Sequence, residues 1–261
     1  MTESTDGNVN STVGRNYYFE DRNEFQELVG DQYENIIRRL RQGILVPQVK
    51  IMEGLLCEGF SGVIIEGPTG YGKTAILNQL AVECQKHFKV MNISCSQLVH
   101  KVVGDSERSI EDLFTTARRI APTILILENI ETLLGGANEQ SFHRNQENSA
   151  RSSNVVMDRL LSCFLTNLDG VVKLQSLDGN AQITSTSNLA KVVVIATTRN
   201  ASNLDSSILR PGRLEEHFTL KSLNAVERKQ IIQHFVKLSI FDDEKVDPAD
   251  VAELVEITSG W

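Results

Sequence analysis

The segment GPTGYGKT, Gly67 to Thr74, places glycines, a lysine and a threonine at the spacing GxxxxGK[ST]. Glycines at these positions let the backbone curl so that successive N–H groups face an anion, and the start of a helix adds a positive dipole end. The lysine can reach the outer phosphates of a nucleoside triphosphate, and the threonine hydroxyl can ligate Mg²⁺. A glycine-rich structural turn is the plainer alternative, but a position between a buried strand and an amphipathic helix favours a phosphate site. The predicted nucleotide-binding residues are Gly67, Pro68, Thr69, Gly70, Tyr71, Gly72, Lys73, Thr74 and Ala75.

A second group of polar residues follows the apolar run that begins at Ile124, in the segment ILILENIE. In P-loop nucleoside triphosphatases an acid at the end of a neighbouring strand holds Mg²⁺, usually through water, so we predict Thr74 and Glu128 as the metal-site residues. A second carboxylate next to this acid usually polarises the attacking water. Asn129 occupies that place. An amide can position a water molecule but cannot accept its proton. Asn129 is therefore compatible with nucleotide binding but lacks the proton acceptor that hydrolysis usually requires.

Short apolar runs alternate with segments of helical periodicity along most of the chain. Runs without polar alternation indicate strands buried on both faces, and apolar residues at i, i+3, i+4 and i+7 indicate one face of a helix. The alternation predicts an α/β fold of the P-loop NTPase kind, with a parallel sheet and flanking helices. We predict strands at 62–67, 89–94, from 124 onward and at 191–198, and helices at 74–88, 106–120, around 160–168, 225–238 and 247–258.

Three regions are predicted along the chain. Residues 1–22 are rich in small polar residues and are expected to be disordered. Residues 23–221 form the α/β nucleotide-binding domain, and residues 222–261, which carry helical patterns alone, form a partial helical lid. Within the α/β domain, two polar stretches at 135–154 and 174–190 lack hydrophobic periodicity and are expected to be mobile surface insertions.

Composition and charge exclude several classes of function. A formal net charge of −8 over 261 residues disfavours a nucleic-acid partner, because proteins that bind the phosphate backbone usually carry a basic surplus. The four cysteines form no CxxC pair and are expected to be buried and reduced, with no zinc site. No apolar segment approaches the ~18 residues of a membrane span, and the polar amino-terminal end has no hydrophobic signal region. We therefore expect an intracellular protein of the cytoplasm, with the nucleus also open, and no membrane partner.

Further segments follow the P-loop in a fixed order: KVVGDSE at 101–107, APTILILENIE at 121–131, DRLLSCFLTNLDGV at 158–171 and VVVIATTRNASNLDSSILRPGRLEEHFTL at 192–220. Together these segments resemble the AAA ATPases, particularly the group around valosin-containing protein and its spermatogenesis-associated relatives. The resemblance covers the chain from about Phe25 to its last residue. It implies a large α/β domain with a small helical lid, assembled with other AAA subunits into a ring that binds ATP at each subunit interface.

The resemblance also implies roles for residues outside the P-loop. Arg210 and Arg213 match arginine fingers, which reach a neighbouring subunit's site and offset the charge growing on the γ-phosphate; ordinary surface salt bridges are the alternative. Val102 and Val103 take the pore-loop positions, where the family often has an aromatic side chain that grips a polypeptide substrate. Substrate threading and a passive loop both stay open for these valines. The segment Leu28 to Asp31 resembles the lining of the adenine pocket.

Four departures from the family pattern bear on function. Glu128 replaces the metal-site Asp, and Asn129 replaces the catalytic Glu, a loss that typically costs about 10²–10⁴-fold in rate. Arg199 stands where the family has the sensor 1 Asn, with Asn200 beside it, which indicates either a register slip or a lost polar contact. The chain also stops before the lid segment that relatives continue. The predicted catalytic positions are Glu128, Asn129, Arg199, Arg210 and Arg213.

Two functions remain open from the sequence. The first is an AAA-family ATP-binding module that drives protein remodelling within a ring assembly. The second is a catalytically impaired nucleotide-binding subunit that supports a partner's ATPase site. An intact P-loop together with Asn129 favours the catalytically impaired subunit for the chain's own site. The negative net charge disfavours a third possibility, a DNA-linked AAA function. Whether the chain is a fragment of a longer two-module protein also stays open.

Overall fold

The computed structural model describes residues 28, 30–55, 57–100, 104–134, 147–176 and 191–239. Its centre is a five-stranded sheet in the order β2-β3-β4-β1-β5. Every adjacent pair of strands is parallel, so all the carboxyl ends lie at one edge of the sheet. The parallel α/β prediction is confirmed. The strands are β1 (Gly62–Glu66), β2 (Lys89–Ser94), β3 (Thr123–Glu128), β4 (Val192–Thr198) and β5 (Glu216–Thr219).

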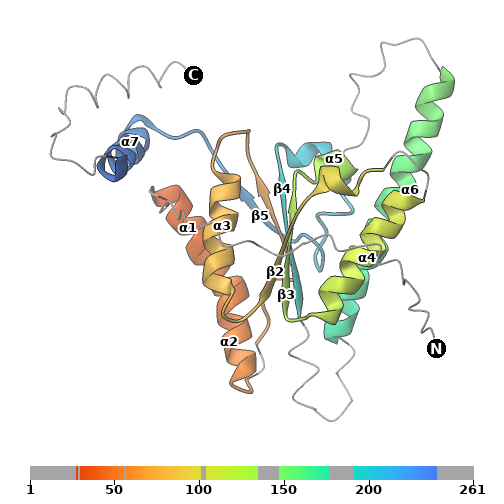
Figure 1. Ribbon diagram of the computed structural model, residues 1–261, viewed down its shortest axis with the longest axis horizontal. Coiled ribbons are helices and arrows are strands. Elements are labelled where there is room, and N and C mark those ends of the chain that lie inside the picture. Colours follow the sequence, from red (N-terminus) through yellow and green to blue (C-terminus); the bar gives the residue numbers. More distant parts are fainter. Residues whose placement is uncertain are drawn as a thin grey trace, which may run out of the picture.

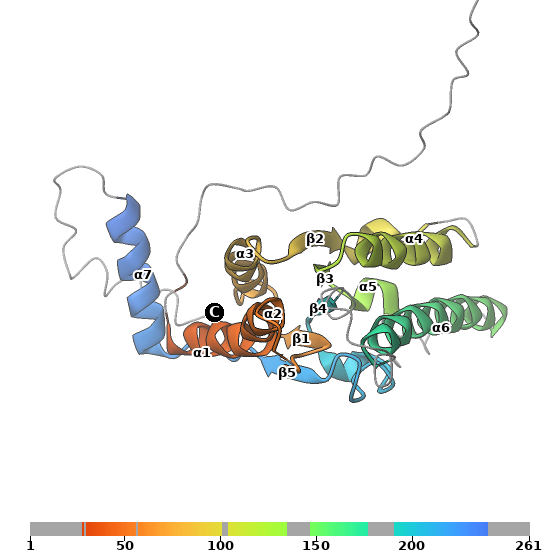
Figure 2. The same cartoon turned by 90° about the horizontal axis from the view of Figure 1, so that it is seen from below.

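Helices cover both faces of the sheet (Figures 1 and 2). On one face lie α1 (Asp31–Leu40), α2 (Val46–Met52) and α3 (Lys73–Cys84). On the other lie α4 (Asp105–Arg119) and α6 (Glu147–Ser176), with the short α5 (Glu131–Leu134) directly after β3. The last described helix, α7 (Ala225–Ser239), follows β5. No helix in the described part of the chain is long and apolar enough to cross a membrane.

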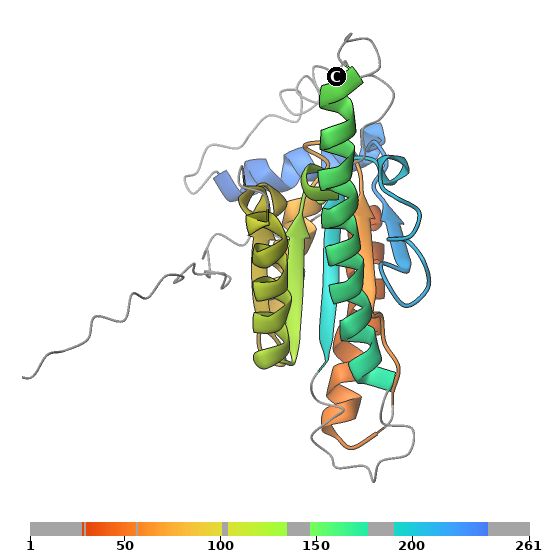
Figure 3. The ribbon, with the colours of Figure 1, turned by 90° about the vertical axis from the view of Figure 1, so that its right-hand side faces the viewer.

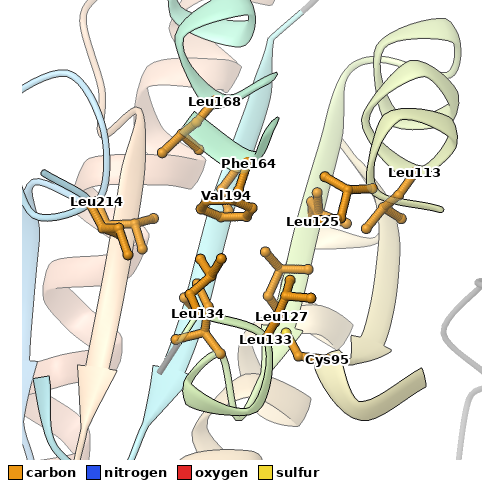
Figure 4. Packing of buried hydrophobic residues seen from close by; sticks show 14 of the residues in the cluster. Cys95, Leu113, Leu125, Leu127, Leu133, Leu134, Phe164, Leu168, Val194 and Leu214 are labelled. Atoms are coloured by element: carbon orange, nitrogen blue, oxygen red, sulfur yellow. The ribbon is translucent and has the colours of Figure 1, made fainter. Parts of the chain in front are cut away.

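The central strands bury both of their faces. On β3, Leu125 and Leu127 belong to the core shared with α4 and α6, whereas Ile124 and Ile126 belong to the core shared with α1 and α3. Figure 4 shows part of the first core, where Leu125 and Val194 of the sheet lie among side chains of the covering helices. Burial on both faces is the reason that these strands are apolar at every position rather than at every second one.

The helix α6 corrects one sequence-based expectation. Residues 147–154 belong to its first turns and 174–176 to its last, although both were expected to be part of mobile surface insertions. The segment ENSARSSN lacks glycine and proline, so nothing stops the helix from extending beyond the residues that the core requires. Figure 3 shows α6 running alongside α4 and past it. The remaining parts of both polar stretches lie outside the described residues, as do the segments 1–22 and 247–258.

The helices α1 and α2 were not predicted from the sequence; a π-helical segment, Arg41–Leu45, joins them into one continuous helical stretch. Pro47 lacks an N–H group, so the carbonyl of Gly43 loses its helical partner. The backbone N–H of Phe60 donates to that carbonyl instead, at 2.8 Å. The Phe60 ring also lies against Gly43, where a β-carbon would meet it at 2.0 Å. The segment leading into β1 therefore supplies the hydrogen bond that the proline cannot make.

Candidate nucleotide-binding site

The predicted P-loop lies where its chemistry requires, between β1, which pairs with β4 and β5, and the start of α3. Gly70 and Gly72 have φ values of +86° and +79°, a conformation that side chains strain to adopt. The Lys73 ammonium donates to the carbonyl oxygens of Gly67 and Pro68, at 2.7 Å for Pro68. The loop thus curls around its own lysine, and the amino end of α3 opens into the same space.

Tyr33 supports the P-loop from α1. Its hydroxyl donates to the carbonyl oxygen of Tyr71 at 3.4 Å, and a β-carbon on Gly72 would lie 3.1 Å from its ring. Tyr33 was not predicted from the sequence. The spacing of Tyr33, Ile36, Ile37 and Leu40 carried the available signal, because these buried residues form one helix face. Tyr33 is nearly fully buried, so its ring is a fixed wall behind the loop.

Lys73 lies within the field of two other charged groups. Burial lowers the pKa of Lys73, the carboxylate of Glu131 raises it, and the guanidinium of Arg199 lowers it. All three residues follow the carboxyl ends of parallel strands, β1, β3 and β4. A lysine ammonium binds phosphate oxygens as a point charge.

The predicted metal-site residues face each other. The Thr74 hydroxyl oxygen lies 3.5 Å from Oε2 of Glu128, and the Asn92 side-chain amide donates to Oε1 of Glu128 at 2.9 Å. A hydroxyl and a carboxylate oxygen suit Mg²⁺, which usually takes one or two protein ligands together with water and substrate phosphates. These residues fit the ion. No group of three or more His, Cys, Asp or Glu side chains in the described ranges forms a metal cluster. Asn92 was not predicted, because its role depends on β2 pairing with β3.

Asn129 has a special backbone conformation. Among the described residues it is the one non-glycine residue with a left-handed φ, 56°. Its N–H donates to the Thr197 hydroxyl at 3.0 Å, and its carbonyl accepts from the N–H of Thr132 at 3.0 Å. These bonds tie the end of β3 to β4 and to the start of α5. The side-chain amide follows directly after Glu128, at the edge of the sheet that carries the P-loop.

Arg199 and Asn200 have different environments at the end of β4. The Asn200 side chain accepts a hydrogen bond from the N–H of Ser202 at 2.8 Å and caps a short helical turn. Arg199 is 68% exposed, and its Nε lies 3.6 Å from Oε1 of Glu131. Both carboxylate oxygens of Glu131 are buried without a hydrogen bond. The Arg199 side chain therefore lies beside Glu131, whereas the Asn200 side chain caps its own turn.

The two predicted arginine fingers differ in their contacts. Arg213 donates from Nε and Nη2 to the two carboxylate oxygens of Asp169 at 2.7 and 2.9 Å, and from Nη1 to the Ser207 carbonyl at 2.7 Å. Its own carbonyl packs against Gly62, at the amino end of β1. Arg210 is exposed to solvent. Neither arginine is brought to the chain's own P-loop, and both assignments stay predictions.

The remaining predictions concern the pore-loop valines, the adenine-pocket segment and the cysteines. Val102 and Val103 lie outside the described residues. In the predicted adenine-pocket segment, Leu28 packs at the edge of the core shared with α1 and α3, and Gly30 is buried. All four cysteines are free, as expected, but only Cys84 and Cys95 are fully buried. Burial raises the pKa of each of these two thiols to about 12, so neither is a nucleophile at neutral pH.

Comparison with known proteins identifies the family to which the chain is similar. The model of the "ATPase family associated with various cellular activities (AAA)" matches residues 63–222. The "ATPase family protein 2 homolog" of Caenorhabditis elegans is 30% identical over 230 residues, which are 87% of this chain and 28% of that protein. The "Cell division cycle protein 48 homolog" of Archaeoglobus fulgidus is 29% identical over 203 residues, 77% of this chain and 23% of that protein. The "Ribosome biogenesis ATPase RIX7" of Saccharomyces cerevisiae is 31% identical over 223 residues, 84% of this chain and 22% of that protein.

The matched segments span about a quarter of the length of these curated relatives. The family model covers the P-loop, β3, β4 and the turn that carries Arg210 and Arg213. The resemblance to the valosin-containing type of AAA protein is confirmed by these relatives. The chain belongs to the AAA ATPase family.

Proposed function

We propose that this chain is a nucleotide-binding AAA subunit that holds ATP·Mg²⁺ in its own site with little hydrolysis and supports the ATPase site of a neighbouring subunit. Asn129 is the observation that carries the proposal. It follows the metal-site Glu128, and its amide cannot take a proton from an attacking water. The P-loop, Thr74 and Glu128 retain the groups that nucleotide and metal binding need.

The arginine turn supports the second half of the proposal. Arg213 packs against the amino end of β1, whereas the P-loop follows its carboxyl end. A strand of five residues spans roughly 15 Å, so this turn cannot serve the phosphates of its own chain. Arg210, exposed on the same turn, is available to a neighbouring subunit. The proposal therefore includes a ring of AAA subunits, with the same or different chains as neighbours.

A second candidate is an ATP-hydrolysing module that drives protein remodelling. Glu131 is the observation that favours it. Its carboxylate oxygens are buried without hydrogen bonds, and it lies close enough to Lys73 to raise the pKa of that lysine. A carboxylate so placed is a candidate to accept a proton in place of the family's catalytic Glu. A polypeptide substrate gripped at Val102 and Val103 belongs to this candidate.

Phosphate release at saturating ATP and Mg²⁺ separates the two candidates. The native chain is compared with Asn129→Glu and Asn129→Asp, after nucleotide binding by all three has been verified. We expect a nearly silent native chain and a rate at least about tenfold higher in one of the variants, part of the 10²–10⁴-fold that a positioned base supplies. Asn129→Asp is included because aspartate tolerates the left-handed backbone at this position better than glutamate does.

Lys73→Ala is the control for a contaminating hydrolase, because its loss of rate ties the activity to this P-loop. If the native chain already hydrolyses ATP as fast as both variants and Lys73→Ala abolishes the rate, the proposal is wrong and the remodelling ATPase is right. Glu131→Gln then tests the substitute base, since glutamine keeps the size of the side chain and removes its proton-accepting charge.

A further inference from the structure

The side chain of Asn92 approaches the metal-site carboxylate from the neighbouring strand. Asn92 of β2 pairs with Ile126 of β3, and Glu128 lies two residues farther along β3. Alternate residues of a strand share one face, and Ile126 belongs to the core shared with α1 and α3. Asn92 and Glu128 therefore both face the side of the sheet that α3 covers, and Nδ2 of Asn92 lies 2.9 Å from Oε1 of Glu128.

The chemistry of the two groups decides which end of the amide faces Glu128. An ionised carboxylate only accepts hydrogen bonds, whereas a side-chain amide has an NH₂ group that donates and an oxygen that accepts. The NH₂ group of Asn92 must therefore face the carboxylate, which leaves the amide oxygen, Oδ1, for another contact. Oδ1 is buried and has no hydrogen-bond partner among the described residues. A buried acceptor of this kind indicates a place where a bound group donates a hydrogen bond.

The second oxygen of Glu128 is directed at the P-loop. Oε2 lies 3.5 Å from the Thr74 hydroxyl oxygen, whereas Oε1 is held by Asn92. A glutamate side chain loses rotational freedom when it is fixed, so a carboxylate that is held in advance loses less freedom when a metal ion binds. Mg²⁺ also keeps several of its water molecules when it binds to protein carboxylates. The unpartnered Oδ1 of Asn92, beside the carboxylate, suits one of these waters.

We infer that Asn92 is a positioning residue for Mg²⁺: its NH₂ group holds Glu128 with one oxygen toward Thr74, and its Oδ1 accepts from a water molecule of the ion. This inference rests on the proposed function, because it concerns the same ATP·Mg²⁺ site. Its consequence is that Mg²⁺ strengthens nucleotide binding through a residue that contacts neither the nucleotide nor the ion directly. Partners of metal ligands commonly change metal affinity by about 10–100-fold.

Titration calorimetry with a non-hydrolysable ATP analogue tests the inference when it is carried out in excess Mg²⁺ and again in a chelator. The measured quantity is the Mg²⁺ gain, defined as the dissociation constant in chelator divided by the dissociation constant in Mg²⁺. Asn92→Leu removes both the donor and the acceptor and should reduce this gain by about tenfold or more. Binding in chelator should stay unchanged, because the P-loop is intact. A merely structural role would weaken binding equally in both solutions.

Two further variants accompany Asn92→Leu. Asn92→Gln keeps both amide groups on a longer stem and should retain part of the Mg²⁺ gain that Asn92→Leu loses. The matched control is Ser96→Ala, which removes an exposed hydroxyl just after β2 that contacts Ser94, at 2.9 Å, rather than Glu128. This control should have the native Mg²⁺ gain.

The outcomes for this inference and for the proposed function are distinguishable. If Asn92→Leu has the native Mg²⁺ gain, or loses affinity equally in both solutions, the inference is wrong and the proposed function stands. If the native chain binds the analogue in neither solution, both are wrong. Circular dichroism of each variant verifies its fold, and Asn92→Val, which suits a strand, replaces Asn92→Leu if the latter unfolds.

Discussion

Asn129 combines a backbone role with a chemical one. Left-handed backbone is unfavourable for most side chains, and asparagine adopts it more readily because its short polar side chain can hydrogen-bond locally. The N–H and carbonyl groups of Asn129 are both used, by Thr197 and Thr132. The residue that is well suited to this backbone is thus one whose amide cannot accept a proton. Under the proposed function, Asn129 holds the shape of the site and leaves it without a general base.

This view predicts an ordered effect of substitutions at Asn129 on the free energy of unfolding. Asn129→Ala should destabilise the chain by about 1 kcal/mol, since alanine has the left-handed penalty without the local hydrogen bonding. Asn129→Gly should stay within about 0.5 kcal/mol of the native value, because glycine adopts this conformation freely. Urea unfolding followed by circular dichroism measures both values. Equal stability of the alanine and glycine variants would show that the left-handed backbone places no demand on the side chain.

Several residues of the site were beyond sequence-based prediction for a physical reason. The P-loop and the polar end of β3 are local patterns, so their positions in the chain predict their place in the fold. Asn92 and Glu66 act through contacts across the sheet, which depend on strand register and on the order of strands. Arg199 and Asn200 were ambiguous as a pair until the backbone fixed which side chain caps the turn.

At the scale of elements, the segment between β4 and β5 is held to α6 by one ion pair. Arg213 uses its Nε, Nη1 and Nη2 within the chain, on Asp169 and on the carbonyl of Ser207. Only 19% of its side chain is exposed. These contacts indicate that Arg213 positions the turn, and that the exposed Arg210 is the better candidate to reach a neighbouring subunit. The resemblance alone did not separate the two arginines.

A double-mutant cycle tests this division of roles. Arg213→Ala should lower the free energy of unfolding by about 1–3 kcal/mol, because it removes hydrogen bonds between charged groups at a partly buried site. Combining it with Asp169→Ala should show a coupling of about 1 kcal/mol. Arg210→Ala is the matched control and should change the stability by less than about 0.5 kcal/mol. Equal losses for the two arginines would contradict the assignment.

The elements that the sequence predicted well are those with a strong local pattern. β2 and β4 lie within one residue of their predicted limits. A short continuous apolar run is typical of a strand that is buried on both faces, so its position is easy to predict. The helical stretch from α1 to α2 was missed because Gly43 and Pro47 interrupt its periodicity. β5 was missed because only Phe218 of its four residues is buried. The start of α6 carries no apolar pattern, so its helicity follows from continuity with the rest of the helix.

At the scale of the whole molecule, the predicted site residues lie at two opposite edges of the sheet. The carboxyl edge carries Lys73, Thr74, Glu128, Asn129 and Arg199, and the turn that carries Arg213 packs at the amino end of β1. Under the proposed function, the first edge binds the chain's own nucleotide and the turn acts on a neighbouring subunit. Nucleotide binding is then testable on the isolated chain, whereas support of a partner's site requires an assembly.

Nucleotide binding should therefore stabilise the isolated chain. The P-loop joins β1 to α3, and α1 packs behind the loop through Tyr33. A bound ligand therefore restrains elements on one face of the sheet. ATP·Mg²⁺ at one hundred times its dissociation constant should add about 2.7 kcal/mol to the free energy of unfolding. For a chain of this size that corresponds to a rise in Tm of roughly 5–10 °C, measured by scanning calorimetry.

Lys73→Ala and removal of Mg²⁺ by a chelator serve as the two controls for this rise. Lys73→Ala should abolish it, because the outer phosphates lose their cation. Removal of Mg²⁺ should reduce it, because Thr74 and Glu128 then meet the phosphates without a metal to link them. A rise that survives Lys73→Ala would place the stabilising nucleotide away from the P-loop and would contradict the site described here.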